Sequence, residues 1–307
     1  MTTALITHPD CHDHVTPPGH PEQVARLDAV LGALDGMDLL RLTAPLGAED
    51  DILRCHPTSY IDSLRQAVPD SGWRSLDADT HMSAGSLAAA FRGVGGAVRA
   101  VDAVLGGEAG NAFVAMRPPG HHAERETAMG FCFFGNVAIA AKHALEHHGL
   151  ARVAIVDFDV HHGNGTQDLV EDDPRILFCS THQSPLFPGT GAAHETGVGN
   201  VLNVPLPDGT GSDGFRAAMD RQVLPRVDAF APDLLLISAG FDAHSADPLA
   251  GMELTTGDFA WITEKLCDLA EKHCAGRVVS CLEGGYDLEA LGASAAAHVT
   301  VLKERAQ

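Results

Sequence analysis

The sequence is poor in basic residues. Lys and Arg number 20 against 41 Asp and Glu, which gives a formal net charge of −21. Binding to a nucleic-acid backbone or to an anionic membrane needs a basic face. We therefore predict that neither nucleic acid nor membrane is a partner, whereas cationic substrates are compatible with the acidic total.

Long apolar runs are also missing. No stretch approaches the roughly 20 residues of a membrane helix, and the best run, Leu234 to Phe241, has the length of a buried strand. The N-terminus lacks a basic region followed by an apolar core, so we expect no signal peptide. The seven cysteines are odd in number, scattered and without a C-x-x-C pair. This pattern argues against a disulfide scaffold, and we predict a cytoplasmic location.

Apolar runs of strand length alternate with segments of helical periodicity along the 307 residues. The expected strands are Ala112–Met116, Val153–Val156, Ile176–Cys179, Leu234–Ser238 and Val278–Leu282. The expected helices are Gly85–Leu105, Asn136–His148, Gly214–Ala229 and Thr256–His273. Strands apolar on both faces that alternate with helices are typical of a parallel sheet covered on both sides. We predict one doubly wound α/β domain over residues 1–307, with loops at Gly32/Gly36 and Asp70–Gly72.

Polar side chains follow each of the five apolar runs. They are His121 and His122, then Asp157, Asp159 and His161, then Ser180 to His182, then Asp242, and finally Tyr286. In open parallel sheets, ligands bind beyond the carboxyl ends of the strands. Five strand ends that deliver His, Asp and Tyr to one rim predict an active site there.

The segment DFDVHH favours a metal site. Side chains two apart on a strand share a face, so Asp157, Asp159 and His161 are expected on one side of it. Together with Asp242 at another strand end, Asp159 and His161 offer two carboxylates and one imidazole. Three protein ligands and an open position are typical of a catalytic zinc site.

The pair His121–His122 follows a Pro-Pro-Gly turn at a strand end, where an imidazole can accept a proton from activated water. Each ring needs an orienting partner, and Asp157 and Asn164 can serve. Tyr286 follows two glycines, and a phenol there can donate to a developing oxyanion. Taken singly, Asp157 and Tyr286 are equally compatible with structural roles.

Other histidines are interpreted as solvated or structural. The histidines of the N-terminal loop are interpreted as solvated, with a lining of the site entrance as the alternative; they are His8, His12, His14 and His20. The pair at the end of an expected helix, His147 and His148, is also interpreted as solvated. His162 should face away from its neighbouring ligand and have a structural role. His244 follows Asp242 too closely to be assigned.

These segments together resemble the zinc-dependent histone deacetylase family, in its class II and bacterial branch. The matching stretches, between about residues 5 and 303, are GHPEQVARL (19–27), RPPGHHAE (117–124), GFCFFGNVAIAA (130–141), DFDVHHGNGTQ (157–167), STHQSPLFPGTG (180–191), SAGFDAHSADPLAGM (238–252) and EGGYDL (283–288). The resemblance implies an arginase-deacetylase-like fold with an eight-stranded parallel sheet and helices on both faces. It implies zinc-dependent hydrolysis of acyl amides, above all N6-acetyl-lysine side chains, to a free amine and acetate.

The resemblance also implies roles by motif position. The zinc ligands are Asp159, His161 and Asp242. The catalytic group comprises His121, His122 and Tyr286, with Asp157 and Asn164 as partners of the two histidines. The substrate tunnel is lined by Phe131, Phe187 and Leu249. His122 would accept the proton of water and return it to the leaving amine, and His121 would stay more cationic. A structural potassium ion would bind the side chains of Asp157, Asp159 and Ser180, with main-chain carbonyls near His161 and Thr181.

Two positions depart from parts of the family pattern. Asn164 replaces the aspartate of class I members, as is usual in class II, and Gly135 stands where many relatives have Asn. Several relatives form dimers or tetramers, so a homo-oligomer is compatible with the resemblance.

Three alternatives were weighed. An arginase-type two-metal enzyme expects an Asp at position 163, which is Gly163 here. An acetylpolyamine amidohydrolase tends to have an acidic gatekeeper where this chain has Leu249. A binding module with a decayed site conflicts with the complete set of ligands, histidines and tyrosine.

Overall fold

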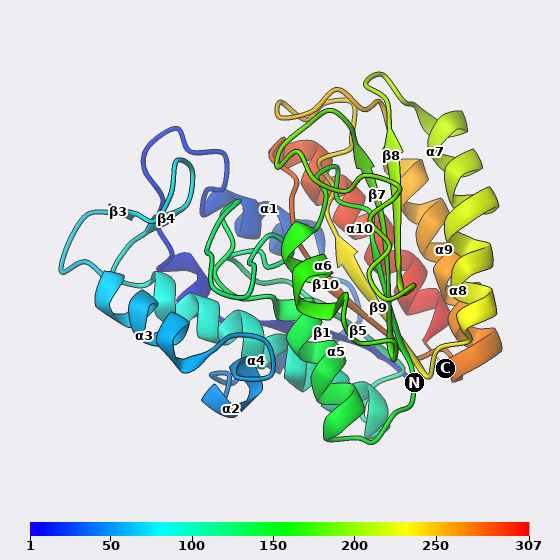
Figure 1. Cartoon of the computed structure of the whole chain (residues 1–307), viewed down its shortest axis with the longest axis horizontal. Helices are drawn as coiled ribbons and strands as arrows, with labels where there is room; N and C mark the ends of the chain where they lie inside the picture. The colour runs from blue at the N-terminus through cyan, green and yellow to red at the C-terminus, as the bar shows by residue number, and fades with distance from the viewer. Residues whose placement is uncertain (307) are drawn as a thin grey trace.

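The structure, a computed structural model, describes residues 1–306 and is built around one eight-stranded parallel sheet (Figure 1). The strand order is β2-β1-β5-β10-β9-β6-β7-β8. The strands are β1 Thr3–Thr7, β2 Leu40–Thr43, β5 Asn111–Val114, β6 Val153–Asp157, β7 Ile176–Gln183, β8 Val201–Leu206, β9 Leu234–Ala239 and β10 Val278–Leu282. A short antiparallel pair, β3 Arg74–Ser75 and β4 His81–Met82, lies outside the sheet.

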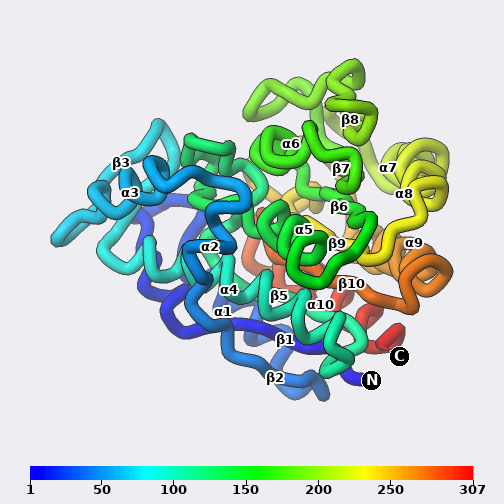
Figure 2. Tube along the Cα trace, turned by 60° about the horizontal axis from the view of Figure 1, so that its bottom comes forward, coloured from blue at the N-terminus to red at the C-terminus, as the bar shows by residue number. Residues whose placement is uncertain are grey.

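Helices cover both faces of the sheet, as Figures 1 and 2 show. They are α1 Ala25–Ala33, α2 Glu49–Ile52, α3 Thr58–Ala67, α4 Ser86–Leu105, α5 Asn136–Glu146, α6 Asn164–Val170, α7 Ser212–Ala218, α8 Leu224–Phe230, α9 Thr256–Cys274 and α10 Leu288–Arg305. α4, α5 and α6 pack in a row on one face, whereas α1, α10, α9 and α8 pack in a row on the other. The predicted fold class is confirmed.

The five strands expected from apolar runs are five consecutive strands of the sheet, β5-β10-β9-β6-β7, and every residue in them is buried. Three strands were not expected. β1 is buried and lies next to the edge, whereas the edge strand β2 alternates exposed and half-buried residues and the edge strand β8 contains Pro205. β7 also extends to Gln183, so Ser180 to His182 belong to the strand rather than follow it.

One local expectation was incomplete and another was wrong. The helix expected over Gly214–Ala229 is confirmed, because residues 212–230 are helical without interruption, but a π-helical turn over Met219–Val223 separates α7 from α8. Pro225 lies in the first turn of α8 and has no N–H for the carbonyl four residues earlier, so a regular helix cannot continue through it. Gly32 lies within α1 rather than in a loop, and the chain turns only at Gly36, whose φ is 76°.

All seven cysteine side chains are free thiols and buried, in agreement with the expected absence of a disulfide scaffold. Among the described residues, no helix is both long and apolar enough to cross a membrane. Because neighbouring parallel strands end at the same edge, the order β5-β10-β9-β6-β7 brings the polar strand ends side by side.

Candidate active site

Asp159, His161 and Asp242 come together at this edge of the sheet. One potential ligand atom from each lies within 4.8 Å of the other two. His161 Nδ1 lies 3.1 Å from Asp159 Oδ1 and 3.1 Å from Asp242 Oδ2. Both carboxylates are fully buried, whereas the His161 side chain also lines the pocket described below.

Backbone hydrogen bonds, rather than strand geometry, align these groups. β6 ends at Asp157, and the next residues leave the sheet. The Asp159 N–H donates to Asp157 Oδ1 at 3.0 Å, and the His161 N–H donates to Asp159 Oδ1 at 2.9 Å. The three side chains therefore lie on a common side, as expected. The expected cause is different, because β6 ends at Asp157 and does not extend to Asp159 and His161.

Glycines allow the carboxylates to approach the backbone closely. A Cβ atom at Gly240 would lie 2.0 Å from Asp159 Oδ2, and one at Gly284 would lie 2.1 Å from Asp242 Oδ2. The Gly284 N–H donates to Asp159 Oδ2 at 2.8 Å. No other residue type fits at these two positions without displacing a carboxylate.

The donor set fits a divalent metal ion. Burial disfavours the charged form of His161, but Asp159 and Asp242 outweigh it and raise its pKa to about 10. The two carboxylates therefore favour positive charge at this place, as a bound cation would supply. Two buried carboxylates and one imidazole nitrogen are ligands that transition metals such as zinc accept.

His121 has a carboxylate on each side. Its Nδ1 donates to Asp157 Oδ2 at 3.0 Å, and its Nε2 lies 3.7 Å from Asp159 Oδ2. Burial opposes protonation, but Asp159 and Asp157 together raise the pKa of His121 well above its ordinary value. The backbone of His121 is fixed by the buried carboxylate of Glu283, which accepts from its N–H at 3.1 Å. The surroundings of His121 thus favour its cationic form.

His122 is held in the opposite protonation state. Asn164 Nδ2 donates to Glu124 Oε1 at 2.7 Å, so its Oδ1 must accept from His122 Nδ1, also at 2.7 Å. This contact leaves the lone pair on His122 Nε2, which has no hydrogen-bond partner among the described residues. Burial, with the nearby His121 and His161, lowers the pKa of His122 well below its ordinary value. The neutral ring is a base with its free nitrogen in the pocket.

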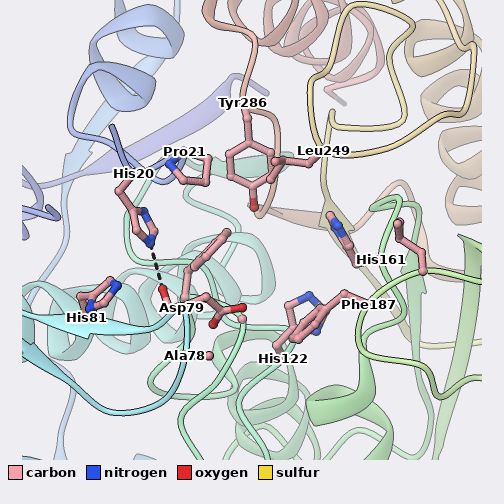
Figure 3. Close-up of a pocket in the computed structure, with 13 residues that line it drawn as sticks. His20, Pro21, Ala78, Asp79, His81, His122, His161, Phe187, Leu249 and Tyr286 are labelled. Carbon is pink, nitrogen blue, oxygen red and sulfur yellow. Dashed lines mark hydrogen bonds between the residues drawn. The ribbon is translucent and has the colours of Figure 1, made fainter. Parts of the chain in front are cut away.

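Tyr286 is fixed from two sides. Its N–H donates to Asp247 Oδ2 at 2.7 Å, and the Arg26 guanidinium lies 4.9 Å from the centre of its ring. No protein group in residues 1–306 pairs with its hydroxyl, which points into the pocket (Figure 3). Burial raises the pKa of Tyr286 well above its ordinary value, so the phenol remains a donor.

A buried charge network supports the turn before Tyr286. Arg26 Nε donates to the Gly285 carbonyl and its Nη2 to the Glu283 carbonyl, each at 2.6 Å. Glu22 pairs with Arg26, Arg117 and His14, and all four side chains are almost fully buried. Sequence reasoning missed this network, although three of its charged residues, Glu22, Arg26 and Arg117, lie within the matching motifs and were a usable signal.

The pocket has a volume of about 370 Å³ and leads from the surface to the cluster (Figure 3). His122, His161 and Tyr286 lie in its wall, together with the three expected tunnel residues, Phe131, Phe187 and Leu249. His20 also lines it, which was the alternative left open for this residue, and so does Asp79, which was not selected from the sequence. His20 Nε2 lies 2.8 Å from the Asp79 carbonyl, which joins the N-terminal loop to the loop between β3 and β4.

Phe131 has an unusual backbone. Its φ is 69°, in the left-handed region that is rare for an aromatic residue. Its N–H donates to Thr80 Oγ1 at 3.0 Å, and its ring packs edge-on against Tyr286 and His20. Such strain persists where the surroundings fix the residue, often at functional sites. Here it directs an aromatic ring into the pocket.

Ser180 lies beside Asp157 in the register of β6 and β7 and is fully buried. Its Oγ lies 2.9 Å from His182 Nδ1. Two of the three side chains expected at a potassium site, those of Asp157 and Ser180, therefore belong to residues paired across β6 and β7.

Gly163 leaves no room for a further ligand. A Cβ atom there would lie 2.3 Å from Asp157 Oδ2 and 3.4 Å from His121 Nδ1. An aspartate at this position, as the arginase-type alternative requires, would displace the His121–Asp157 pair. The local packing therefore favours a single metal at the strand ends.

Several histidines differ from their interpretation as solvated residues. His14 is 1% exposed and lies 2.6 Å from Ser86 Oγ, and His20 lines the pocket. His148 contacts Asp102 rather than solvent alone. His162 is buried between Thr190 and Gln167, as a structural role requires. His14 and His148 are distant in sequence from Ser86 and Asp102, so these contacts were not visible in the pattern.

Comparison with known proteins identifies the family. The histone deacetylase domain matches residues 20–302. The histone deacetylase-like amidohydrolase of Pseudomonas aeruginosa is 43% identical over 284 residues, which cover 89% of this chain and 74% of that protein. The human polyamine deacetylase HDAC10 is 36% identical over 325 residues, which cover 98% of this chain and 48% of that protein.

The fold gives the same result. The crystal structure of the HDA15 HD domain matches with a TM-score of 0.94 and 34% identity, covering 99% of this chain and 88% of that one. The family model matches most of the sequence, the fold matches, and the strand ends carry paired histidines and a tyrosine. The chain therefore belongs to the histone deacetylase family of amidohydrolases.

Proposed function

We propose that the protein is a zinc-dependent amidohydrolase that removes acyl groups, chiefly acetyl, from the side-chain amine of N6-acetyl-lysine. The observation that carries the proposal is the pocket itself. A slot between Phe131 and Phe187 leads to a neutral base, a phenol donor and three buried metal-ligating groups. An aromatic slot suits the four-methylene stem of lysine, which is apolar along its length.

Asp159, His161 and Asp242 would hold the zinc ion. When bound there, zinc supplies Lewis acidity toward the acyl oxygen and makes water easier to deprotonate. A potassium ion beside Asp157 and Ser180 would support the same segment from behind. These assignments rest on the convergence of the side chains and on their chemistry.

The chain's own residues then divide the proton transfers. His122 accepts a proton on Nε2 from the attacking water, because Asn164 fixes its other nitrogen as a donor. His122 returns that proton to the leaving amine. His121 remains cationic between Asp157 and Asp159 and lowers the energy of the negative charge that develops nearby. Tyr286 donates to the tetrahedral oxyanion, a contact present only after attack.

Acetylpolyamines are the alternative substrates. The Asp79 carboxylate belongs to a residue of the pocket wall, and the chain carries a formal charge of −21, so a distal ammonium would be attracted. The half-buried Leu249 on the loop after Asp247 argues for acetyl-lysine, because an apolar side chain offers an ammonium no partner there.

Leu249→Glu is expected to shift the substrate preference toward acetylpolyamines. The ratio of kcat/KM for acetylspermidine over an acetyl-lysine peptide should rise roughly five- to tenfold, since a half-exposed ion pair contributes about 1 kcal/mol. Leu249→Gln, of equal length but uncharged, is the control and should leave the ratio nearly unchanged. A wild type that already strongly prefers acetylspermidine contradicts the argument from Leu249. If the protein hydrolyses neither substrate, the proposed function is wrong.

Asp242→Ala is expected to lose one zinc ion per chain relative to the wild type. The variant leaves His161 and Asp159 as the only ligands, too few to hold the metal tightly. Elemental analysis after dialysis measures the difference, and circular dichroism checks the fold. A variant that retains all of its zinc contradicts the assignment, whereas the loss of two ions would point to a two-metal centre of the arginase type.

A further inference from the structure

A second group of potential metal ligands lies outside the active site. Asp102 near the end of α4, His143 in α5, and His147 and His148 just after it each offer one ligand atom, and these atoms lie within 4.8 Å of one another. α5 begins at the active-site loops and ends at the turn that leads into β6, so the group lies at the amino ends of the strands. In Figure 1 this end of α5 is at the bottom, away from the arrowheads of the sheet.

The contacts within the group are short. Asp102 Oδ1 lies 2.8 Å from His143 Nε2 and 2.7 Å from His148 Nε2. His147, one helical turn after His143, stacks on it with ring centres 4.8 Å apart. The hydrogen bonds to Asp102 involve the rings of His143 and His148 but not the ring of His147. A shared cation would use all four groups.

A carboxylate also lies beside the far nitrogen of His143, the place where metal-bound histidines usually have an outer partner. Its side chain is 6% exposed, and its Nδ1 lies 3.3 Å from Asp51 Oδ1 without forming a hydrogen bond, so this buried nitrogen has no hydrogen-bond partner. A carboxylate beside the far nitrogen of a ligating imidazole orients the ring and increases its basicity. Asp51 is in turn contacted by Arg54 at 3.4 Å, which fixes its position.

The electrostatics favour a cation. Asp102 and Asp51 both face the group, and the C-terminal end of α5 carries partial negative charge. Tetrahedral donors about 2.1 Å from a metal lie about 3.4 Å apart, so the contacts to Asp102 must lengthen by roughly 0.6 Å. The Asp102 and His148 side chains are 40% and 23% exposed, which leaves them free to make that adjustment.

We propose that Asp102, His143, His147 and His148 form a second, peripheral binding site for a divalent transition metal of the borderline class, such as zinc or nickel. Imidazole-rich sets of this kind favour those ions over magnesium or calcium. The ion joins the end of α4 to the end of α5 and is independent of the chemistry in the pocket.

The test is zinc stoichiometry in a crossed set of variants. Each protein is dialysed against micromolar free zinc, and bound zinc per chain is measured by elemental analysis. We expect two ions in the wild type, one in His147→Ala/His148→Ala, one in Asp242→Ala, and none in the combined variant. His194→Ala, which removes an exposed histidine elsewhere, is the control and should retain two.

Thermal unfolding gives a second readout. Adding zinc to protein that already holds the Asp242-dependent ion should raise the Tm of the wild type and of His194→Ala, but not that of His147→Ala/His148→Ala, because ligands of the folded state stabilise it. Deacetylase activity should be equal in all three. A single ion in the wild type, or two ions in the double variant, overturns the proposal. Two ions in Asp242→Ala would instead contradict the active-site assignment and leave this one intact.

Discussion

Tyr286→Phe is expected to lower kcat by roughly 10²–10³-fold, with a much smaller change in KM. The hydroxyl contributes mainly once the carbonyl carbon has become tetrahedral, so its loss raises the energy of the transition state more than that of bound substrate. The ring contacts should survive, because Arg26 packs on its face and Phe131 against it edge-on. Steady-state kinetics on one acetyl-lysine peptide measure the effect.

Two controls accompany this variant. Zinc content should equal that of the wild type, and a hydroxamate inhibitor should still bind, since the metal supplies most of its affinity. A near-normal kcat would mean that Tyr286 is only a turn residue and that carbonyl polarisation comes from the metal and the histidines. Loss of zinc would mean that the phenol positions the strand-end carboxylates instead.

His122→Ala is expected to reduce kcat by roughly 10²–10⁴-fold, the usual contribution of a positioned general base. The basis is the free Nε2 of a ring whose Nδ1 is tied to Asn164. His20→Ala is the matched control, because His20 also lines the pocket but its Nε2 contacts the Asp79 carbonyl. Its kcat should change far less than that of His122→Ala. Equal losses in the two variants would show that pocket shape, rather than proton transfer, is responsible.

The pH profile tests the same assignment in the wild type. The base works only when neutral, so kcat/KM should rise with pH through the pKa that His122 has in the substrate-free enzyme. Because burial and its cationic neighbours lower that pKa, the acidic limb should lie below the ordinary value of 6.5. An acidic limb above that value contradicts the role of His122 as the neutral base.

Local chemistry in the sequence was enough to predict which polar residues would lie together at the strand ends. The five apolar runs followed by polar residues correspond to five adjacent strands, and the expected partners of His121 and His122 lie within hydrogen-bond distance of them. Both predictions rest on properties that neighbouring residues share. The edge strands were missed because their exposed faces weaken the apolar signal.

Long-range contacts account for what the sequence pattern did not predict. Arg26 reaches the carbonyl of Gly285, which is 259 residues later in the chain, and His14 is buried against Glu22 and Ser86. A histidine in a loop rich in Pro and Gly gives no sign of such burial. The π-helical turn before Pro225 was different, because the proline was visible and its effect on the helix was underestimated.

The position of β10 has a consequence for biosynthesis. β10 is the final strand of the chain to be made, yet it lies in the middle of the sheet, between β5 and β9. Until residues 278–282 have left the ribosome, the nascent sheet has a gap lined by two unpaired strand edges, the feature that invites aggregation. Tyr286 and the carbonyls that Arg26 binds follow only after that strand. A chain that terminates before β10 would therefore lack the middle strand of the sheet, and chaperones would have to shield the exposed edges of β5 and β9.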